Sequence, residues 1–351
     1  AAMHDMEFGE DLLAIARAGA GVNNIPLERC AKEGIVVFNT PGANANAVKE
    51  LVLCALLLGS RGIVDGISWC KDNADDETIA KSAEKAKKAF AGREIAGKRL
   101  GVIGLGAIGA LVANAAIDLG MDVYGYDPYV SVGAAWRLNP AVRHAPELAD
   151  IFANCDYITI HVPALPNTIG MIDDDAIAQM QDGVVFLNFS RDTLVNNDAM
   201  AAGLASGKVG AYITDFATPE VMRMEHAIVL PHLGASTEEA EDNCAKMAVR
   251  QMMAYLETGA IVNSVNFPAC TLGALAAGCA RIAVLRANDA EVLGRAELVL
   301  RDQGITVQSS VDVTRGDTAY TVYDVTDADT VDSAAQALSD WDGIYKVRVI
   351  R

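Results

Sequence analysis

The chain of 351 residues is poor in basic residues, in aromatic residues and in long apolar runs, and two of these shortages exclude a class of protein. The 28 Lys and Arg residues stand against 46 Asp and Glu, which gives a formal net charge of −18. A surface this acidic repels phosphate backbones, which argues against a nucleic-acid partner. The longest apolar stretch, residues 51–59, is far shorter than the ~20 residues of a membrane-spanning helix, which argues against a membrane protein.

The sequence also lacks a secretory signal and paired cysteines. The first ten residues, AAMHDMEFGE, contain no basic segment followed by an apolar one, so we expect a cytoplasmic protein. The seven Cys residues are odd in number, form no Cys-x-x-Cys pair and mostly lie in apolar stretches. We therefore expect reduced thiols that pack in the core, with neither disulfides nor a metal site.

The patterns that are present predict an α/β protein with 52% hydrophobic residues and 30 Gly. Strand-like and helix-like segments alternate over residues 98–232, which predicts βαβ crossovers and a doubly wound parallel sheet of the Rossmann type. Residues 1–45 alternate in the same way and indicate a piece of a second α/β layer. Apolar residues recur at helical spacing over residues 48–69, and the charged stretch 71–88 is typical of a solvated helix.

The C-terminal part has a different pattern. A long helix is expected over residues 236–258, and the Ala/Gly-rich stretch 269–279 is typical of a linker. Residues 280–351 then follow the order strand, helix, strand, strand, helix, strand. This βαββαβ order predicts a small ferredoxin-like domain with helices on one face of an antiparallel sheet.

The clearest local motif is the glycine-rich turn between the strand RLGVI and the next helix. Gly104 permits a tight turn, Gly106 lets the backbone approach a pyrophosphate, and Gly109 lets helix and strand pack closely. Asp127 ends the next strand, where a carboxylate accepts hydrogen bonds from the ribose hydroxyls of NAD and repels the 2′-phosphate of NADP. The motif predicts NAD binding, although an ordinary glycine turn with a surface Asp would show the same residues.

Three chemically capable residues follow later strands, at the edge where open α/β sheets bind ligands. Arg191 in LNFSRD can grip a carboxylate through two parallel hydrogen bonds. His232 in LPHLGAST can move a hydroxyl proton, and Glu220 in DFATPE can orient its imidazole. A helix-capping arginine and a loop histidine fit the same spacing, so both interpretations stay open.

Taken together, these motifs resemble a known family, the NAD-dependent D-2-hydroxyacid dehydrogenases with a C-terminal ACT regulatory domain. The resemblance rests on RAGAGVNNIPLERCAKEGIVVFNTPGANANAVKE, GVIGLGAIG, GYDP, LNFSRD, DFATPE and PHLGAST in this order. It implies a flavodoxin-like substrate domain at residues 1–47 and 234–268, lacking about forty residues at its start. It also implies an NAD-binding domain at residues 48–233, a linker at 269–279 and an ACT-like domain at 280–351.

The resemblance assigns roles to individual residues. It makes Arg191, Glu220 and His232 catalytic, and Arg191 and His232 also substrate contacts. The further substrate contacts that it implies are Arg17, Asn39, Asn44 and Asn46. The implied cofactor contacts are Gly104, Gly106, Ala107, Ile108, Gly109, Asp127, Val162, Phe189, Ser190, Asp215, Leu233, Gly234 and Ala235.

The implied activity is the NAD-dependent oxidation of 3-phospho-D-glycerate to 3-phosphohydroxypyruvate, the first step of serine biosynthesis, by a homo-oligomer. The alternatives are a dehydrogenase acting on glycerate or 2-hydroxyglutarate, an NAD-sensing protein without turnover, and an amino-acid sensor that acts through the tail. The tail departs from the family pattern for binding a serine effector, because Arg286–Glu291 replaces His-x-Asn-x-Pro-Gly and Thr306 replaces an Asn. Ala20 likewise stands where many relatives have a Thr that contacts the cofactor.

Overall fold

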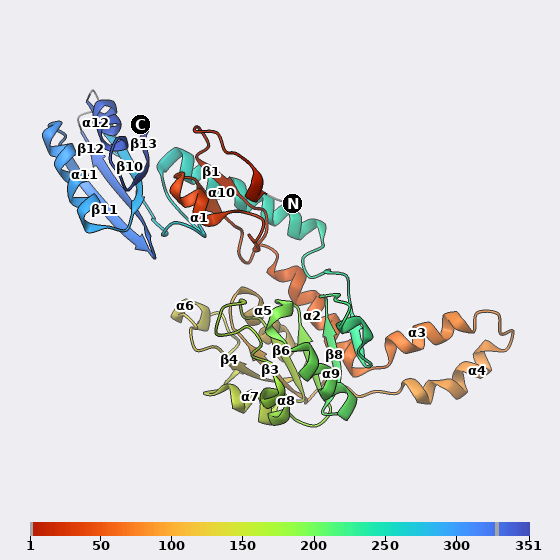
Figure 1. The fold of residues 1–351 in the computed structure, drawn as a ribbon. Helices are drawn as coiled ribbons and strands as arrows, with labels where there is room; N and C mark the ends of the chain where they lie inside the picture. Colours follow the sequence, from red (N-terminus) through yellow and green to blue (C-terminus); the bar gives the residue numbers. More distant parts are fainter. Residues whose placement is uncertain (1–2, 327–329) are drawn as a thin grey trace. The chain divides into compact units, whose positions relative to one another are not determined.

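The computed structural model describes residues 3–326 and 330–351, and the chain divides into two compact units (Figure 1). One unit is Asn44–Ala240, and the other combines Ala1–Ala43 with Glu241–Arg351. The resemblance implied inner borders a few residues away, at residues 48 and 233, and those domain borders stay a prediction. The ACT-like domain at residues 280–351 stays a prediction, and in the structure these residues lie in the same compact unit as the N-terminal segment.

A seven-stranded parallel sheet forms the centre of the unit Asn44–Ala240 and confirms the predicted Rossmann-type fold. Its strand order is β5-β4-β3-β6-β7-β8-β9, so the chain builds outward from β3 in one direction and then in the other. The strands are β3 (Arg99–Ile103), β4 (Asp122–Tyr126), β5 (Arg143–His144), β6 (Tyr157–Ile160), β7 (Val184–Asn188), β8 (Val209–Thr214) and β9 (Ala227–Val229).

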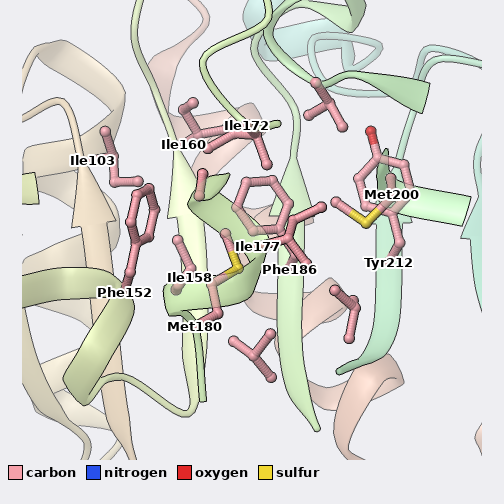
Figure 2. Close-up of a cluster of buried hydrophobic side chains, with 14 of the residues drawn as sticks. Ile103, Phe152, Ile158, Ile160, Ile172, Ile177, Met180, Phe186, Met200 and Tyr212 are labelled. Carbon is pink, nitrogen blue, oxygen red and sulfur yellow. The ribbon is translucent and has the colours of Figure 1, made fainter. Parts of the chain in front are cut away.

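Helices cover both faces of this sheet because its strands are apolar on both sides. On one face α2 (Ala45–Ser60) and α5 (Ala107–Asp118) share a core with Val102, Val185 and Leu187. The other face carries α7 (Leu148–Asn154), α8 (Asp174–Gln179) and α9 (Asn197–Ser206). Figure 2 shows this second core, in which Phe186 of β7 belongs to one cluster with Ile177 and Met200. Near-continuous apolar strands of this kind are typical of a buried parallel sheet. The remaining short elements of the unit are α6 (Val132–Ala135), η3 (Asp192–Leu194) and η4 (Val221–Arg223).

The helical spacing of apolar residues over 48–69 covers two helices, because the chain breaks at Arg61. Arg61 has extended backbone angles, and the Arg93 N–H donates to the Ser60 carbonyl oxygen, which ends α2. The next helix, α3 (Ile63–Asp72), leaves at a 70° bend and continues into α4 (Ile79–Ala86) and η2 (Lys87–Phe90). We call residues 63–90 the arm, since they extend away from the sheet (Figure 1).

No single helix in residues 3–326 and 330–351 is long and apolar enough to cross a membrane. The α2–α3 pair passes that test of length and composition only when its two bent helices are taken together. The cytoplasmic location expected from the sequence stays a prediction.

The other unit contains a short α/β segment and a four-stranded antiparallel sheet. In the α/β segment β1 (Ala14–Ala16) pairs in parallel with β2 (Val36–Phe38). The four-stranded sheet has the order β11-β12-β10-β13 and confirms the predicted βαββαβ fold. Its elements are β10 (Ala280–Ala287), α11 (Ala290–Asp302), β11 (Val307–Arg315), β12 (Thr318–Val325), α12 (Val331–Ser339) and β13 (Ile344–Ile350). The unit also contains η1 (Met3–Asp5), α1 (Leu27–Lys32) and most of α10 (Glu238–Thr258).

The two faces of the four-stranded sheet have different partners. Ile282 and Val284 of β10 point to the side covered by α11 and α12. Leu285 of β10 and Tyr320 of β12 share the opposite cluster with Phe38 and Tyr255 from the rest of the unit. The C-terminal sheet is therefore built into the core of this unit.

Candidate active site

The sheet order reverses between β3 and β6, which run in parallel from Leu100 beside Tyr157 to Ile103 beside Ile160. The chain leaves these two strands in opposite directions, so a crevice opens beyond their carboxyl ends. The glycine-rich turn follows β3, and His161 and Val162 follow β6. The predicted cofactor loop thus lies at the switch point of the sheet.

Glycine stands at each of the three positions of this loop for a different physical reason. Gly104 has a φ of +90°, and a Cβ there would lie 2.7 Å from the His161 carbonyl oxygen. A Cβ at Gly109 would lie 1.9 Å from the Gly104 carbonyl oxygen, so the first turn of α5 packs on the loop. A Cβ at Gly106 would meet no atom within 4 Å. That open space lies at the start of α5, whose first residues are Ala107 and Ile108, so an anion can approach its N–H groups.

Asp127 is fixed beside the loop. Its Oδ2 accepts a hydrogen bond from the Leu105 N–H at 2.9 Å, and its Oδ1 accepts one from the Tyr129 N–H at 2.9 Å. These bonds hold a carboxylate at the end of β4, the strand next to β3. This is the place from which a carboxylate can bind a ribose in a dinucleotide fold.

The carboxyl end of β6 carries a neutral histidine. Burial lowers the pKa of His161 to about 3, so its imidazole is uncharged at neutral pH. Its Nε2 lies 2.9 Å from the Thr159 hydroxyl, and its Nδ1 is buried with no hydrogen-bond partner among the described residues. The Ser190 hydroxyl donates to the Val162 carbonyl oxygen at 2.6 Å. That bond ties the residues after β7 to the residues after β6.

Arg191 is an exposed guanidinium that the fold does not neutralise. Buried Asn188 shapes the turn that presents it: its Nδ2 donates to the Arg191 carbonyl oxygen at 2.8 Å and its Oδ1 accepts from the Ser190 N–H at 3.1 Å. Phe189 is buried beneath this turn. The Arg191 side chain donates only to the Ser190 carbonyl oxygen, at 2.6 Å, and no Asp or Glu of the described residues forms an ion pair with it. The guanidinium is therefore available to an anionic ligand.

His232 follows β9 in a left-handed conformation, with a φ of +51°. Its N–H donates to the Asp215 carbonyl oxygen at 2.9 Å, and its exposed ring packs edge-on against Phe216, with the ring centroids 5.5 Å apart. Such backbone strain is uncommon outside glycine and persists only where the surroundings enforce it. Here two neighbouring residues after β8 fix the place of the imidazole.

Asp215 is a buried carboxylate next to this histidine. Its Oδ2 accepts from the Gly234 N–H at 2.9 Å, and its Oδ1 has no partner among the described residues. Burial raises the pKa of Asp215, while the Gly234 hydrogen bond and the nearby His232 charge oppose that rise. Leu233 and Ala235 flank Gly234 in the same loop and remain partly exposed. An unused buried acceptor of this kind suits a ligand that brings a hydrogen-bond donor.

Glu220 lies in the loop between β8 and β9 and begins η4. Its own backbone N–H and the Thr218 hydroxyl donate to its carboxylate and lower its pKa, with a smaller contribution from Arg223. The structure thus pairs Glu220 with its local turn, whereas the charge of His232 acts on the carboxylate of Asp215. The predicted pairing of Glu220 with His232 stays a prediction.

Two of the predicted substrate residues meet in the other unit. Arg17 follows β1 and Asn39 follows β2, and the Arg17 N–H donates to the Phe38 carbonyl oxygen at 2.9 Å. The Asn39 amide donates to the Ala20 carbonyl oxygen at 2.7 Å. A Cβ at Gly19 would lie 1.1 Å from Arg17 Nη1, so the glycine lets the guanidinium fold over this loop. Arg17 forms no ion pair among the described residues.

Asn44 and Asn46 lie at the start of α2. Asn44 is the residue before the first turn, and its side chain forms no capping hydrogen bond. The Asn46 amide is engaged within the helix, since it donates to Glu50 at 2.8 Å and accepts from Lys49 at 2.7 Å. Of these two, Asn44 has the freer side chain.

The sequence analysis did not identify Asn188 or Phe216 as site residues. Asn188 nevertheless holds the turn that presents Arg191, and Phe216 packs against His232. The signal for Asn188 was present, because it is an amide in the otherwise apolar strand VVFLNF. Phe216 gave no signal, since an apolar residue after a strand is common in any core.

Comparison with known proteins adds to this geometry. The family model for the D-isomer specific 2-hydroxyacid dehydrogenase, NAD binding domain, matches residues 55–234. D-3-phosphoglycerate dehydrogenase of Rattus norvegicus is 35% identical over 268 residues, which cover 75% of this chain and 48% of that protein. The protein of the same name from Mycobacterium tuberculosis is 35% identical over 261 residues, covering 73% and 47%. The chain spans about half the length of the curated relatives it matches.

Solved structures agree with the family match. The NAD⁺-bound 3-phosphoglycerate dehydrogenase of Entamoeba histolytica is 28% identical, with a TM-score of 0.59 over 74% of this chain and 76% of that one. The holo form of D-mandelate dehydrogenase from Rhodotorula graminis shares the fold, at 22% identity and a TM-score of 0.65 over 76% and 78%. A dinucleotide loop at the switch point and a family model that covers half of the chain lead to one conclusion. The chain belongs to the D-isomer specific 2-hydroxyacid dehydrogenases and carries their NAD binding domain.

Proposed function

We propose that this chain is an NAD-dependent dehydrogenase that oxidises 3-phospho-D-glycerate to 3-phosphohydroxypyruvate. The main support for this proposal is the position of three residues at the carboxyl ends of successive strands. Arg191 follows β7, Asp215 follows β8 and His232 follows β9. An unpaired guanidinium and an exposed imidazole at one sheet edge are the two groups that a 2-hydroxy acid requires. The relatives named D-3-phosphoglycerate dehydrogenase support the choice of substrate.

The residues at the switch point fit NAD. The open space at Gly106 leaves room for a pyrophosphate at the start of α5, and Asp127 stands where a ribose would bind. The buried Oδ1 of Asp215 has no partner among the described residues and can accept from an amide of the ligand. When bound, NAD supplies the carbon that takes up a hydride.

Side chains of this protein bind the negative charges of the substrate and transfer its hydroxyl proton. Arg191 holds the carboxylate and the C2 oxygen of the substrate through two hydrogen bonds. His232 takes the hydroxyl proton during oxidation and returns it during reduction. A carboxylate stabilises the resulting imidazolium, and Glu220 is the proposed partner. With a net charge of −18, the anionic substrate depends on local cations, of which Arg17 is the candidate for the phosphate.

The test is to follow NADH consumption with 3-phosphohydroxypyruvate, hydroxypyruvate and 2-oxoglutarate in parallel. We expect the highest kcat/KM with the phosphorylated ketoacid. A preference for either of the other two would identify a different D-2-hydroxyacid dehydrogenase. Tight NADH binding without turnover of any of them would identify an NAD sensor and contradict the proposal.

Matched serine substitutions at Gly106 and Gly109 should separate cofactor binding from folding. Ser at Gly106 enters open space and is a good N-cap, so we expect an unchanged melting temperature and weakened NADH binding. Ser at Gly109 meets the Gly104 carbonyl oxygen, so we expect a loss of about 1–3 kcal/mol of stability. Thermal unfolding and NADH fluorescence measure the two effects. Equal NADH affinity in G106S and the unmodified chain would refute the assigned pyrophosphate site.

We propose that the chain is a homo-oligomer and that a second copy covers the arm. Neither α3 nor α4 has a buried residue, and Ile63, Val64 and Ile67 are exposed on α3. A cavity of about 470 Å³ opens beside them, lined by Trp69 and Phe90 among others. Helices this short are marginal without tertiary packing, so the arm needs a covering surface.

Light scattering should show that Ile67→Asp lowers the mass to that of one chain. Leu119→Asp is the control, because Leu119 is exposed to a similar extent at the end of α5 and is not part of the arm. An unchanged mass in I67D, or a monomeric unmodified chain, would rule out the arm as the interface.

An amino-acid effector of the C-terminal domain stays a proposal. Within the segment that departs from the family pattern, buried Arg286 pairs with Asp312 at 2.7 Å and the Asn288 amide donates to the Gly316 carbonyl oxygen at 2.8 Å. Both side chains are therefore engaged within the domain.

A further inference from the structure

Side chains of the C-terminal sheet donate hydrogen bonds to the carbonyl groups at the end of helix α10. The last four carbonyl groups of a helix have no partner within the helix, and α10 has no basic residue in its last turn. The sheet supplies side-chain donors to three of these carbonyl groups. Arg348 of β13 donates from Nη1 to the Tyr255 carbonyl oxygen at 3.2 Å and from Nη2 to that of Leu256 at 3.1 Å. Arg281 of β10 donates to the Thr258 carbonyl oxygen at 2.6 Å.

These donors are themselves fixed. Arg281 is buried and forms a two-pronged ion pair with Asp324, at 2.6 and 2.9 Å. The Tyr320 hydroxyl donates to the Gly259 carbonyl oxygen at 2.8 Å, just after the helix. Cations at a helix C-terminus also interact favourably with the helix dipole. The position of α10 is therefore set by the C-terminal sheet.

A stack of three side chains runs from this sheet into the α/β segment. The Arg348 guanidinium lies 4.4 Å from the centroid of the Tyr255 ring. The Tyr255 ring in turn packs against Phe38, with centroids 5.6 Å apart and planes tilted by 58°. Tyr255 and Phe38 are fully buried, so neither ring has room to move independently.

Phe38 is the last residue of β2, and the loop with Asn39 follows it; the loop with Arg17 follows Ala16, which pairs with Phe38 in the parallel strand pair. Its carbonyl oxygen accepts from the Arg17 N–H at 2.9 Å. Two further bonds join the loops: the Thr40 N–H donates to the Gly19 carbonyl oxygen at 3.0 Å, and the Gly19 N–H donates to the Thr40 hydroxyl at 2.6 Å. The loop pair, residues 17–20 and 39–40, therefore moves with Phe38.

We propose that Arg348 and Tyr255 are positioning residues for the substrate, which hold the loop pair in its binding geometry through Phe38. The C-terminal domain then contributes to substrate affinity without touching the substrate. This inference rests on the proposed function only in taking Arg17 and Asn39 as substrate contacts. The stack itself lies within one compact unit.

The test compares Arg348→Met with Arg295→Met. Arg295 also lies over a ring in the same domain, 5.3 Å from the Trp341 centroid, but far along the chain from the stack. In R348M we expect the KM for 3-phosphohydroxypyruvate to rise about three- to thirtyfold with kcat nearly unchanged. We also expect faster hydrogen exchange at the amides of residues 17–20 and 38–40. R295M should show neither change.

Two more variants keep the result decisive. Arg348→Lys keeps the charge and a donor, so it should restore part of the KM even if R348M folds poorly. Tyr255→Leu removes the ring that joins the Arg348 guanidinium to Phe38, so it should raise the KM and the exchange rates as R348M does. An unchanged KM and unchanged exchange in R348M would overturn the proposal, as would an unchanged KM in Y255L. If the unmodified chain does not turn over, the proposed function fails, and the exchange rates still decide about the stack.

Discussion

Replacement of His232 by Asn is expected to lower kcat by about 10²–10⁴-fold and to leave NADH binding intact. Loss of a general acid–base group has an effect of this size. Asn is the substitution of choice because the backbone at position 232 has a φ of +51°, which Asn tolerates better than most residues. The variant therefore removes the imidazole and retains the loop. Steady-state kinetics with 3-phosphohydroxypyruvate, and NADH titration by fluorescence, measure the two quantities.

His226 offers a closely matched control for this prediction. It is exposed and has a φ of +61°, but it precedes β9, whereas His232 follows β9. The two histidines therefore lie at opposite edges of the sheet. H226N should keep full activity. Similar kcat values for H232N and H226N would mean that His232 is a loop residue without a role in proton transfer.

Replacement of Arg191 by Leu is expected to lower kcat/KM by roughly 10²–10⁴-fold. The estimate follows from the loss of two hydrogen bonds to a charged group, each worth about 1.5–3 kcal/mol. The fold should tolerate the change, because Arg191 is exposed and donates only to the neighbouring Ser190 carbonyl oxygen. Thermal unfolding and NADH affinity should therefore stay close to those of the unmodified chain.

Arg99→Leu is the control for Arg191→Leu. Arg99 is also exposed, but it begins β3 at the opposite edge of the sheet, and its side chain donates one long hydrogen bond, 3.4 Å, to the Asn154 carbonyl oxygen. R99L should keep its activity. If R191L lost NADH binding and turnover to the same extent, Arg191 would serve the cofactor loop and the assignment to the substrate carboxylate would be wrong.

The sequence predicted those features that depend on neighbours along the chain. The alternation of strand-like and helix-like patterns predicted the parallel sheet and the βαββαβ order. The spacing of the glycines predicted the cofactor loop after β3. It missed the break at Arg61, because apolar residues on both sides keep a helical spacing and the break depends on the distant Arg93. The sequence analysis also missed the contact of the Phe216 ring with the His232 ring. This contact forms only because β8 and β9 lie side by side in the sheet.

The relation between the C-terminal sheet and the α/β segment could not be predicted either. Arg348 lies in the strand IYKVRVI, where an arginine usually faces solvent. Its partners are backbone carbonyl groups, which leave no pattern in a sequence. The linker predicted at residues 269–279 stays a prediction, and the shared cluster of Phe38, Tyr255, Leu285 and Tyr320 joins segments that are far apart in the sequence.

The central claim is that this chain moves a hydride between C2 of a phosphorylated D-2-hydroxy acid and NAD. The most direct measurement is to incubate the chain with 3-phosphohydroxypyruvate and NADH that carries deuterium at both C4 positions, and to examine the product by NMR and mass spectrometry. We expect 3-phospho-D-glycerate that carries deuterium at C2. A product without deuterium, a product of L configuration, or unchanged ketoacid with NADH bound would contradict the account.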